Sequence, residues 1–258
     1  MEIRQWAIHI LGGLTLEDKL FCPEILTDLD PGEPLFWSEP SRPASLAFKK
    51  FTKQEKLPPF HEHNDPYKRA ICLHRFAGHE LLAVELMAYA LLAFPSMPKH
   101  FRKGLANTLK EEQWHVKIYQ KRLLEMGTVL GDHPLNGRFW QLTPHLTTPL
   151  KYLSAIHLTL EMANLDFAPH YGASFERHGD SASSDLMKQI FSDELSHVGF
   201  GYFWLNKCKD TNLCSYDAWL SSLPDILPAK RAKGFIFQEK ARLDAGLPKD
   251  WVSNLQKL

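Results

Sequence analysis

The sequence predicts an all-α protein built around four long helices. Three observations lead to this fold class. Four long segments are bounded by proline, glycine or capping residues, as helices are. Few runs alternate with the period of two that half-buried strands require. Carboxylates and histidines also recur at matched positions inside the four segments, which indicates that these segments are related in pairs.

The composition is that of a folded protein with no strong charge bias. The 258 residues include 30 basic and 30 acidic side chains, so the net charge gives no support to a nucleic-acid-coating or membrane-attracted protein. No run reaches the roughly 18 apolar residues that span a bilayer. The four cysteines form no Cys-x-x-Cys pair. We therefore expect a cytoplasmic protein with reduced thiols, no membrane and a single domain over residues 1–258.

The N-terminal quarter is expected to wrap the surface rather than join the bundle. Residues 15–20 look like a short capped helix. Residues 23–66 are rich in proline, which removes a backbone donor and restricts the residue before it. Segment 1–66 is therefore predicted to be a short helix followed by a proline-rich wrap that covers the surface or a site.

The bundle core is expected at about residues 67–207. Its helices are predicted over residues 67–94, 98–126, 149 to about 171, and 183 to about 207. Pro169 is expected to kink or end the third of them, because proline cannot continue the backbone ladder.

The C-terminal extension, residues 208–258, is expected to add shorter helices. Helical patterns occur around residues 216–223 and 229–245. They follow the fourth long helix and are predicted to pack outside the bundle.

The second and fourth long helices each carry the pattern Glu-x-x-His. Glu112 precedes His115, and Glu194 precedes His197. Three residues correspond to roughly 300° of helical rotation and about 4.5 Å of rise, so each pair points to one side of its helix. One helix can then supply two ligands to one metal ion.

The first and third helices complete the pattern with one glutamate each. Glu80 lies 32 residues before Glu112, and Glu161 lies 33 residues before Glu194. The three positions of the first half thus recur 81 or 82 residues later. Packing alone does not explain a repeat of polar residues inside apolar helices. The repeat predicts two helical hairpins, related by a pseudo-twofold axis, that meet at a shared site.

These residue types form the ligand inventory of a dinuclear carboxylate site. A glutamate from each of two helices and a Glu-x-x-His from each of the other two is the set found in di-iron bundles. Carboxylates and imidazoles suit iron, with manganese as the alternative, whereas a structural zinc site would favour cysteine. We expect two iron ions and no bound nicotinamide or flavin. The predicted metal ligands are Glu80, Glu112, His115, Glu161, Glu194 and His197.

Two acids lie five residues beyond the first and third ligands. Glu85 follows Glu80, and Asp166 follows Glu161. Five residues are roughly 140° of rotation, so both members of a pair cannot face one seam. Glu80 and Glu161 are favoured because their hairpin spacings bring them level with the partner helices. The reverse choice stays open, and Glu85 and Asp166 are otherwise expected to support the ligands or to pair with basic neighbours.

Two further acids come directly before the Glu-x-x-His glutamates. Metal-bound histidines usually donate their other ring hydrogen to a carboxylate or carbonyl. The pseudo-symmetry predicts that Asp193 supports His115 and that Glu111 supports His197, with simple surface acids as the alternative. Isolated histidines such as His74 are expected to be packing or surface residues.

Three runs of this sequence resemble a bacterial ferritin-like family catalogued only as a domain of unknown function. They are His74-Arg-Phe-Ala-Gly-His-Glu-Leu-Leu-Ala-Val-Glu85, Glu161-Met-Ala-Asn-Leu-Asp-Phe-Ala-Pro-His-Tyr171 and Phe191-Ser-Asp-Glu-Leu-Ser-His-Val-Gly-Phe-Gly201. The likeness covers most of the chain. It implies the ferritin-like four-helix fold and a dinuclear site, but no established reaction. More distantly, the arrangement is similar to di-iron hydroxylases acting on quinone precursors or on modified tRNA.

The leading functional hypothesis is an oxygen-activating di-iron oxidoreductase, either a hydroxylase or an oxidase. It would take dioxygen or peroxide together with a small-molecule substrate, which the sequence does not name. The first alternative is a ferroxidase or peroxide-handling iron protein. The second is a non-catalytic bundle in which metals only brace the helices. The fold alone does not choose among them, because many chemistries use one scaffold.

Overall fold

The computed structural model describes residues 1–49 and 56–258. Residues 50–55, which belong to the predicted proline-rich wrap, lie outside the described residues. The described part contains ten α-helices and no strand, and its two isolated bridges join Glu2 to Thr27 and Phe48 to Leu135. The all-α prediction is therefore confirmed. The chain divides into two compact units, Met1–Gln141 and Leu142–Leu258, and the expected single domain stays a prediction.

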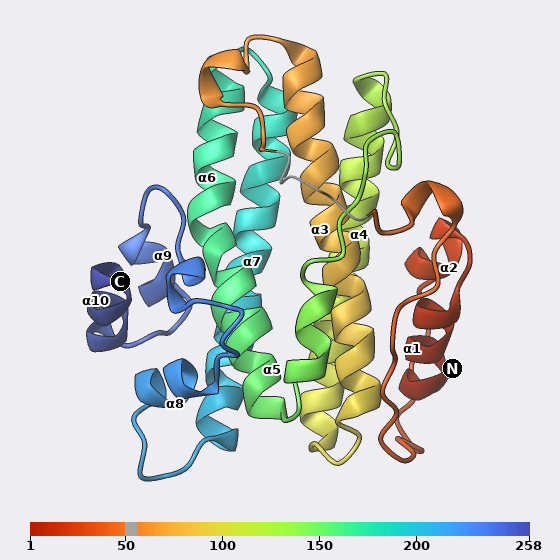
Figure 1. Cartoon of the computed structure of the whole chain (residues 1–258), viewed down its shortest axis with the longest axis vertical. Coiled ribbons are helices and arrows are strands. Elements are labelled where there is room, and N and C mark those ends of the chain that lie inside the picture. The colour runs from red at the N-terminus through yellow and green to blue at the C-terminus, as the bar shows by residue number, and fades with distance from the viewer. Residues whose placement is uncertain (50–55) are drawn as a thin grey trace. The chain divides into compact units, whose positions relative to one another are not determined.

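The first unit is centred on a hairpin of two long helices, α3 (Pro66–Ala93) and α4 (Lys99–Glu125). They pack along each other and are joined by residues 94–98 (Figure 1). Asp65 caps α3 by accepting a hydrogen bond from the backbone of Tyr67, and Pro66 occupies the first turn, where its missing N–H costs nothing. Both helices lie where the sequence predicted them.

Two short helices precede this hairpin. The predicted one, α2 (Leu16–Leu20), begins at a Thr15 capping box. The other, α1 (Ile3–Gly12), was not predicted, because its short apolar run gives little period to recognise. Its Trp6 is fully buried, and α1 packs against α3. Farther along the described N-terminal chain, the backbone N–H of Leu35 donates to the carbonyl of Leu92 at the end of α3.

The second unit contains the other long hairpin. Its first arm begins with α5 (Pro149–Ala155), passes through a π-helical turn (Ile156–Glu161) and continues as α6 (Met162–Arg177). Its second arm is α7 (Ser181–Cys208), which packs along α6 and the π turn. Of the two effects predicted for Pro169, an end of the helix is wrong, since α6 continues to Arg177, and a kink stays a prediction. Packing of the later turns of α6 outweighs the roughly 3 kcal/mol that an internal proline costs.

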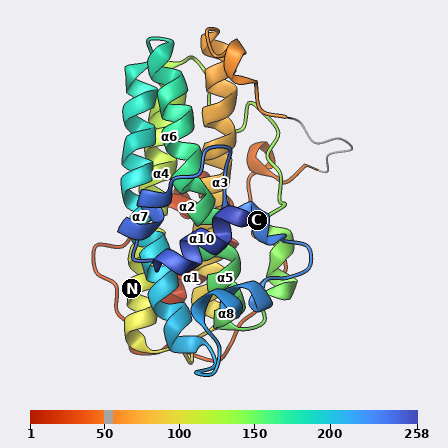
Figure 2. The ribbon, with the colours of Figure 1, turned by 90° about the vertical axis from the view of Figure 1, so that its left-hand side faces the viewer.

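Shorter helices follow and pack against this hairpin. They are α8 (Ser215–Ser222), α9 (Glu239–Asp244) and α10 (Lys249–Lys257), and Figure 2 shows α8 below α10 on this unit. The indole rings of Trp219 in α8 and Trp251 in α10 belong to the local hydrophobic core, with centroids 5.8 Å apart. The short helix predicted at residues 216–223 is confirmed.

The helix predicted over residues 229–245 is wrong. The segment forms a 3₁₀ turn at Ala229–Ala232, an irregular stretch and then α9. Asp166 accepts the backbone N–H groups of Gly234 and Gln238, so these groups bond to a side chain instead of a helix ladder. Gly234 fits this approach because a Cβ atom there would lie 2.8 Å from that of Asp166. Tertiary hydrogen bonds therefore override the local helical pattern.

One described helix, α3, is long and apolar enough by composition to cross a membrane. However, 83% of its most apolar 18-residue window is buried inside the protein. A core helix of a soluble protein has this property, so the burial is consistent with the expected solubility. The cytoplasmic location stays a prediction.

Candidate metal centre

The α3–α4 hairpin brings three predicted ligands together. Ligand atoms of Glu80, Glu112 and His115 all lie within 4.8 Å of one another, and all three residues are buried. The Nδ1 atom of His115 is 3.6 Å from Glu80 and 3.5 Å from Glu112. Two ligands of one small cation are about 3 to 3.5 Å apart, because each lies about 2.1 Å from it. This donor set and spacing fit a transition-metal ion.

The electrostatics of Glu80 also suit a cation. Burial raises the pKa of Glu80 well above its usual range, and the neighbouring Glu112 carboxylate raises it further, while His115 opposes both effects. Two buried carboxylates side by side favour keeping a proton in the metal-free protein. A bound cation would replace that proton and offset the repulsion.

The second hairpin holds the matching residues. Glu161 ends the π turn, while Glu194 and His197 lie on α7, and all three are buried. The Nδ1 atom of His197 is 3.6 Å from Glu194, which repeats the spacing of His115 and Glu112. Asn164 donates a hydrogen bond of 2.8 Å to the other oxygen of Glu194 and orients that carboxylate.

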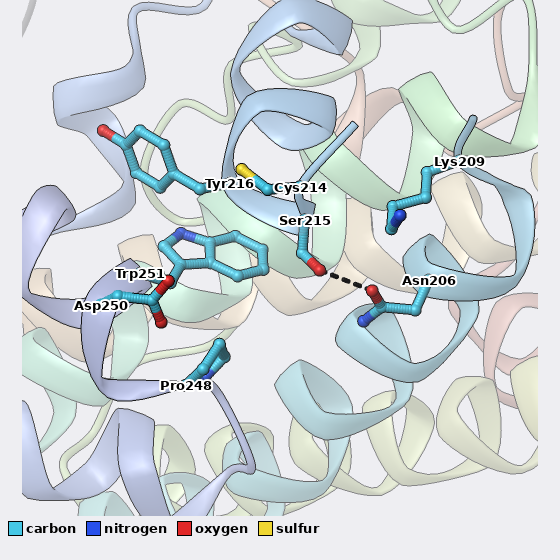
Figure 3. A pocket seen from close by; sticks show the side chains of 8 residues that line it. All are labelled: Asn206, Lys209, Cys214, Ser215, Tyr216, Pro248, Asp250 and Trp251. Carbon is cyan, nitrogen blue, oxygen red and sulfur yellow. Dashed lines mark hydrogen bonds between the residues drawn. The ribbon is translucent and has the colours of Figure 1, made fainter. Parts of the chain in front are cut away.

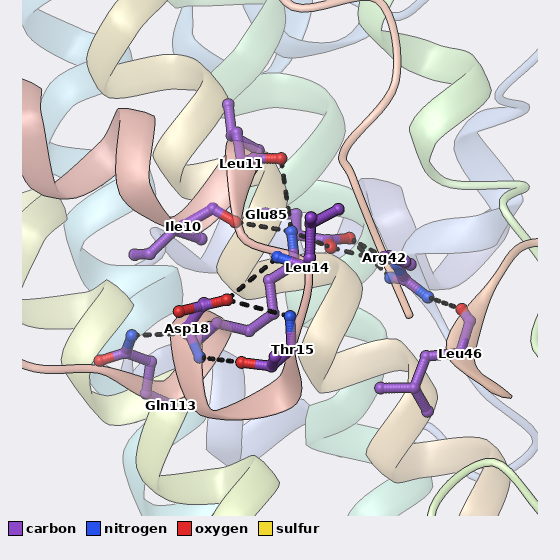
Figure 4. Close-up of polar contacts among 10 residues, drawn as sticks. Ile10, Leu11, Leu14, Thr15, Asp18, Arg42, Leu46, Glu85 and Gln113 are labelled. Carbon is purple, nitrogen blue, oxygen red and sulfur yellow. Dashed lines mark hydrogen bonds and ion pairs between the residues drawn. The ribbon is translucent and has the colours of Figure 1, made fainter. Parts of the chain in front are cut away.

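Glu85 takes part in a separate buried ion cluster (Figure 4). Arg42, from the N-terminal wrap, donates from Nη2 to Glu85 over 2.6 Å and from Nε over 3.0 Å. The Nζ atom of Lys19 lies 3.4 Å from the same carboxylate and donates to the carbonyl of Ile10. Burial lowers the pKa of Lys19, and Glu85 opposes that effect. Of the roles left open for Glu85, the structure shows pairing with basic neighbours.

Asp166 is held in the same manner in the second unit. Arg242 of α9 donates from Nη1 and Nη2 to its two oxygens, over 2.7 and 2.8 Å. Together with the backbone N–H groups of Gly234 and Gln238, this saturates the carboxylate. Asp166 therefore ties α9 to α6. The sequence offered no signal for the partner, because Arg242 lies 76 residues away.

The two acids expected to support the histidines differ in burial. Glu111 is exposed on α4, whereas Asp193 is half-buried on α7. Asp193 accepts hydrogen bonds of 3.0 and 2.9 Å from the side-chain nitrogen of Gln189. Their support of His197 and His115 stays a prediction.

The sequence reasoning missed His157, which lies in the π turn four residues before Glu161. Its ring is fully buried, and its Nδ1 atom contacts the Glu161 carboxylate directly. Residues four apart are neighbours on a helix, so this spacing was the available signal.

His74 has a structural role that the sequence did not specify. Its Nε2 atom accepts hydrogen bonds from the backbone N–H groups of Gly131 (2.9 Å) and His133 (3.3 Å), and so holds the chain that follows α4. Burial lowers the pKa of His74 to about 4. The ring must be neutral for Nε2 to accept these bonds.

We expect acid to weaken the fold through His74. Between the unfolded pKa of about 6.5 and the folded value of about 4, the unfolded chain binds the extra proton. The free energy of unfolding should therefore fall by up to about 3 kcal/mol as the pH drops through this window. Urea titrations at several pH values measure this change in the free energy of unfolding. His74→Gln keeps an acceptor without the titration and should lose this pH dependence; an unchanged dependence would contradict the role.

A pocket of about 350 Å³ lies elsewhere in the second unit, between the end of α7 and the starts of α8 and α10 (Figure 3). Asn206, Ser215 and Trp251 are among its lining residues, and Ser215 donates a hydrogen bond of 2.5 Å to Asn206. None of the predicted ligands lines it. It is therefore separate from the candidate metal residues.

Comparison with known proteins identifies the family. Residues 18–253 match the family described as "Protein of unknown function (DUF455)". The chain belongs to the DUF455 family. An "Uncharacterized protein" of Haemophilus influenzae is 22% identical over 201 residues, which cover 73% of this chain and 69% of the relative. No solved structure matches the chain.

The match bears on the predictions in two ways. The resemblance to a family of unknown function is confirmed, and the DUF455 match includes every predicted ligand. The family description carries no reaction, cofactor or fold. Membership of the wider ferritin-like di-iron superfamily stays a prediction.

Proposed function

We propose that this DUF455 protein is a ferritin-like, dinuclear metal carboxylate protein that activates oxygen for the oxidation of a small molecule. The buried cluster of Glu80, Glu112 and His115, with ligand atoms within 4.8 Å of one another, carries the proposal. Burying two carboxylates and an imidazole together is costly unless they are paired or hold a metal. The proposed ligands for two ions are Glu80, Glu112, His115, Glu161, Glu194 and His197.

The match between the two hairpins supports two ions rather than one. Each hairpin has a glutamate on its first arm and a Glu-x-x-His on its second, with nearly equal distances from histidine to glutamate. Four carboxylates and two imidazoles are the ligand set of di-iron bundles. A structural zinc site would favour cysteine, which this set lacks, so iron is favoured, and manganese is the alternative.

The roles of the residues follow from their chemistry. Glu80 and Glu112 would neutralise the cations and release the proton that they hold in the metal-free state. Asn164 would keep Glu194 in one orientation by its hydrogen bond. Reduced iron held in this way would supply the electrons and open coordination positions that oxygen chemistry needs.

Metal analysis tests the proposal directly. We expect the purified protein, loaded anaerobically with ferrous iron, to hold about two ions per chain. Glu112→Ala and Glu194→Ala should each lower the content to about one ion or fewer, because each removes a central carboxylate. Glu125→Ala, an exposed acid on α4, is the control and should bind as the wild type does. A wild type that binds no transition metal, or one zinc ion only, would overturn the proposal.

Oxygen uptake separates a redox site from a structural brace. The anaerobic ferrous protein should consume dioxygen when mixed with oxygenated buffer, as followed with an oxygen electrode. Repeated turnover of added ferrous iron alone would favour a ferroxidase, whereas a need for a reductant and an organic compound would favour an oxidase or hydroxylase. No uptake by the iron-loaded protein would leave only the bracing role.

A further inference from the structure

Hydrogen bonds stabilise the π turn that ends at Glu161 in the second hairpin. The backbone N–H of Met162 bonds to the carbonyl of His157, five residues back. Thr159 donates its hydroxyl to the carbonyl of Ser154 over 2.7 Å and accepts the indole N–H of Trp219 over 3.1 Å. These hydrogen bonds stabilise the π-helical backbone of the turn. Such π turns inside α-helices are frequent at functional sites.

The π turn presents His157 to the proposed ligand Glu161. The Nδ1 atom of His157 contacts Oε2 of Glu161. His115 and His197 also direct Nδ1 at a glutamate of the proposed site. In His157 this contact is a direct hydrogen bond, shorter than the 3.5 and 3.6 Å that separate the other two histidines from their glutamates, so the ring is held against the Glu161 carboxylate.

Two atoms of this pair have no partner in the part of the chain that the structure describes. Oε1 of Glu161 and Nε2 of His157 are both buried and make no hydrogen bond there. Buried polar atoms are paired in roughly nine cases out of ten. Two ligand-type atoms on adjacent turns without partners indicate that a further group, such as a metal ion, belongs here.

The sequence makes room for His157 in the second hairpin only. A Cβ atom at Gly201 of α7 would collide with Cβ of His157, so glycine is needed for the close approach. The internal repeat aligns His157 with Phe76 and Gly201 with Tyr119. Those two rings pack together in the first unit, with centroids 6.4 Å apart. The first hairpin thus has two aromatic rings where the second has an imidazole and a glycine.

We propose that His157 is a third histidine ligand, bound through a ring nitrogen to the ion that Glu161 holds. The proposal rests on the proposed dinuclear site and makes that site asymmetric, with one more imidazole in the second hairpin than in the first. Imidazole ligands suit iron, whereas manganese is best served by carboxylates and carbonyls. His157 therefore favours iron over manganese at this position.

The test uses the full chain loaded with cobalt(II), with His157→Phe as the main variant. Phenylalanine occupies the equivalent position of the first hairpin, Phe76. It keeps an aromatic ring for packing and removes both ring nitrogens. X-ray absorption counts imidazoles per metal, and competitive titration measures affinity. Three imidazoles shared by two ions average about 1.5 per ion, so we expect the count to fall to about 1 per ion, with a loss of cobalt affinity of at least about 10-fold. Iron should also lose more affinity than manganese does.

Controls separate this inference from the proposed function. His170→Phe changes another histidine of the same arm and should leave the imidazole count and affinity at wild-type values. If circular dichroism shows that His157→Phe does not fold, His157→Gln replaces it in the test. This variant also lacks the imidazole and should show the same fall in the imidazole count. A folded variant with the wild-type imidazole count and affinity overturns the role of His157. A wild type that binds no cobalt or iron instead overturns the dinuclear site itself.

Discussion

Glu80→Gln is expected to empty the first hairpin of metal and, at the same time, to stabilise the metal-free protein. The amide cannot replace a carboxylate ligand, so the metal content should fall to about one ion or fewer per chain. Burial and Glu112 raise the pKa of Glu80, so keeping this acid in place costs free energy at neutral pH. Removing it should therefore raise the free energy of unfolding of the metal-free protein.

Glu85→Gln, on the same helix, is the matched control. It should destabilise the protein and leave the metal content unchanged. It leaves Lys19 and Arg42 buried without their counter-charge. Breaking a buried ion pair costs about 3 to 5 kcal/mol, whereas the metal content should stay at the wild-type level. Thermal unfolding with and without metal, together with elemental analysis, measures both variants. If Glu85→Gln loses the metal and Glu80→Gln keeps it, α3 presents its other acid to the metal.

Asp166→Ala is expected to destabilise the second unit by about 3 to 5 kcal/mol, because Arg242 is then left buried without its counter-charge. For a chain of this size, each kcal/mol lowers the melting temperature by about 2 to 4 °C. The backbone N–H groups of Gly234 and Gln238 lose their acceptor as well. Because this pair does not involve metal binding, the loss of stability should appear in thermal unfolding of the metal-free protein.

Two further variants check the Asp166 prediction. Lys240→Ala removes an exposed ion pair with Asp244 on the same helix as Arg242, and should change stability by less than about 1 kcal/mol. In Asp166→Leu/Arg242→Met, two apolar residues replace the pair, and the loss should be smaller than for Asp166→Ala. Equal losses in Asp166→Ala and Lys240→Ala would show that the buried pair adds nothing.

The long helices and the candidate ligands were accessible to sequence reasoning because their signals are local. Proline at residues 66 and 98 marks where α3 and α4 begin, and helical periodicity carries each onward. The Glu-x-x-His spacing brings Glu112 and His115 to one side of α4 without reference to any other element. The 32-residue separation then sufficed to bring Glu80 to the same level of the hairpin.

The remaining features depend on contacts between residues distant in sequence. The partners of Glu85 come from Lys19 and Arg42, 66 and 43 residues earlier, so no local pattern separates its role from that of Glu80. Hydrogen bonds from Gly234 and Gln238 to Asp166 replace a predicted helix in the C-terminal segment. Propensity and periodicity act within a few turns, whereas burial and ion pairing act across the fold. Tertiary contacts therefore decided that Glu85 pairs with basic side chains of the N-terminal segment, while Glu80 lies in the buried cluster with Glu112 and His115.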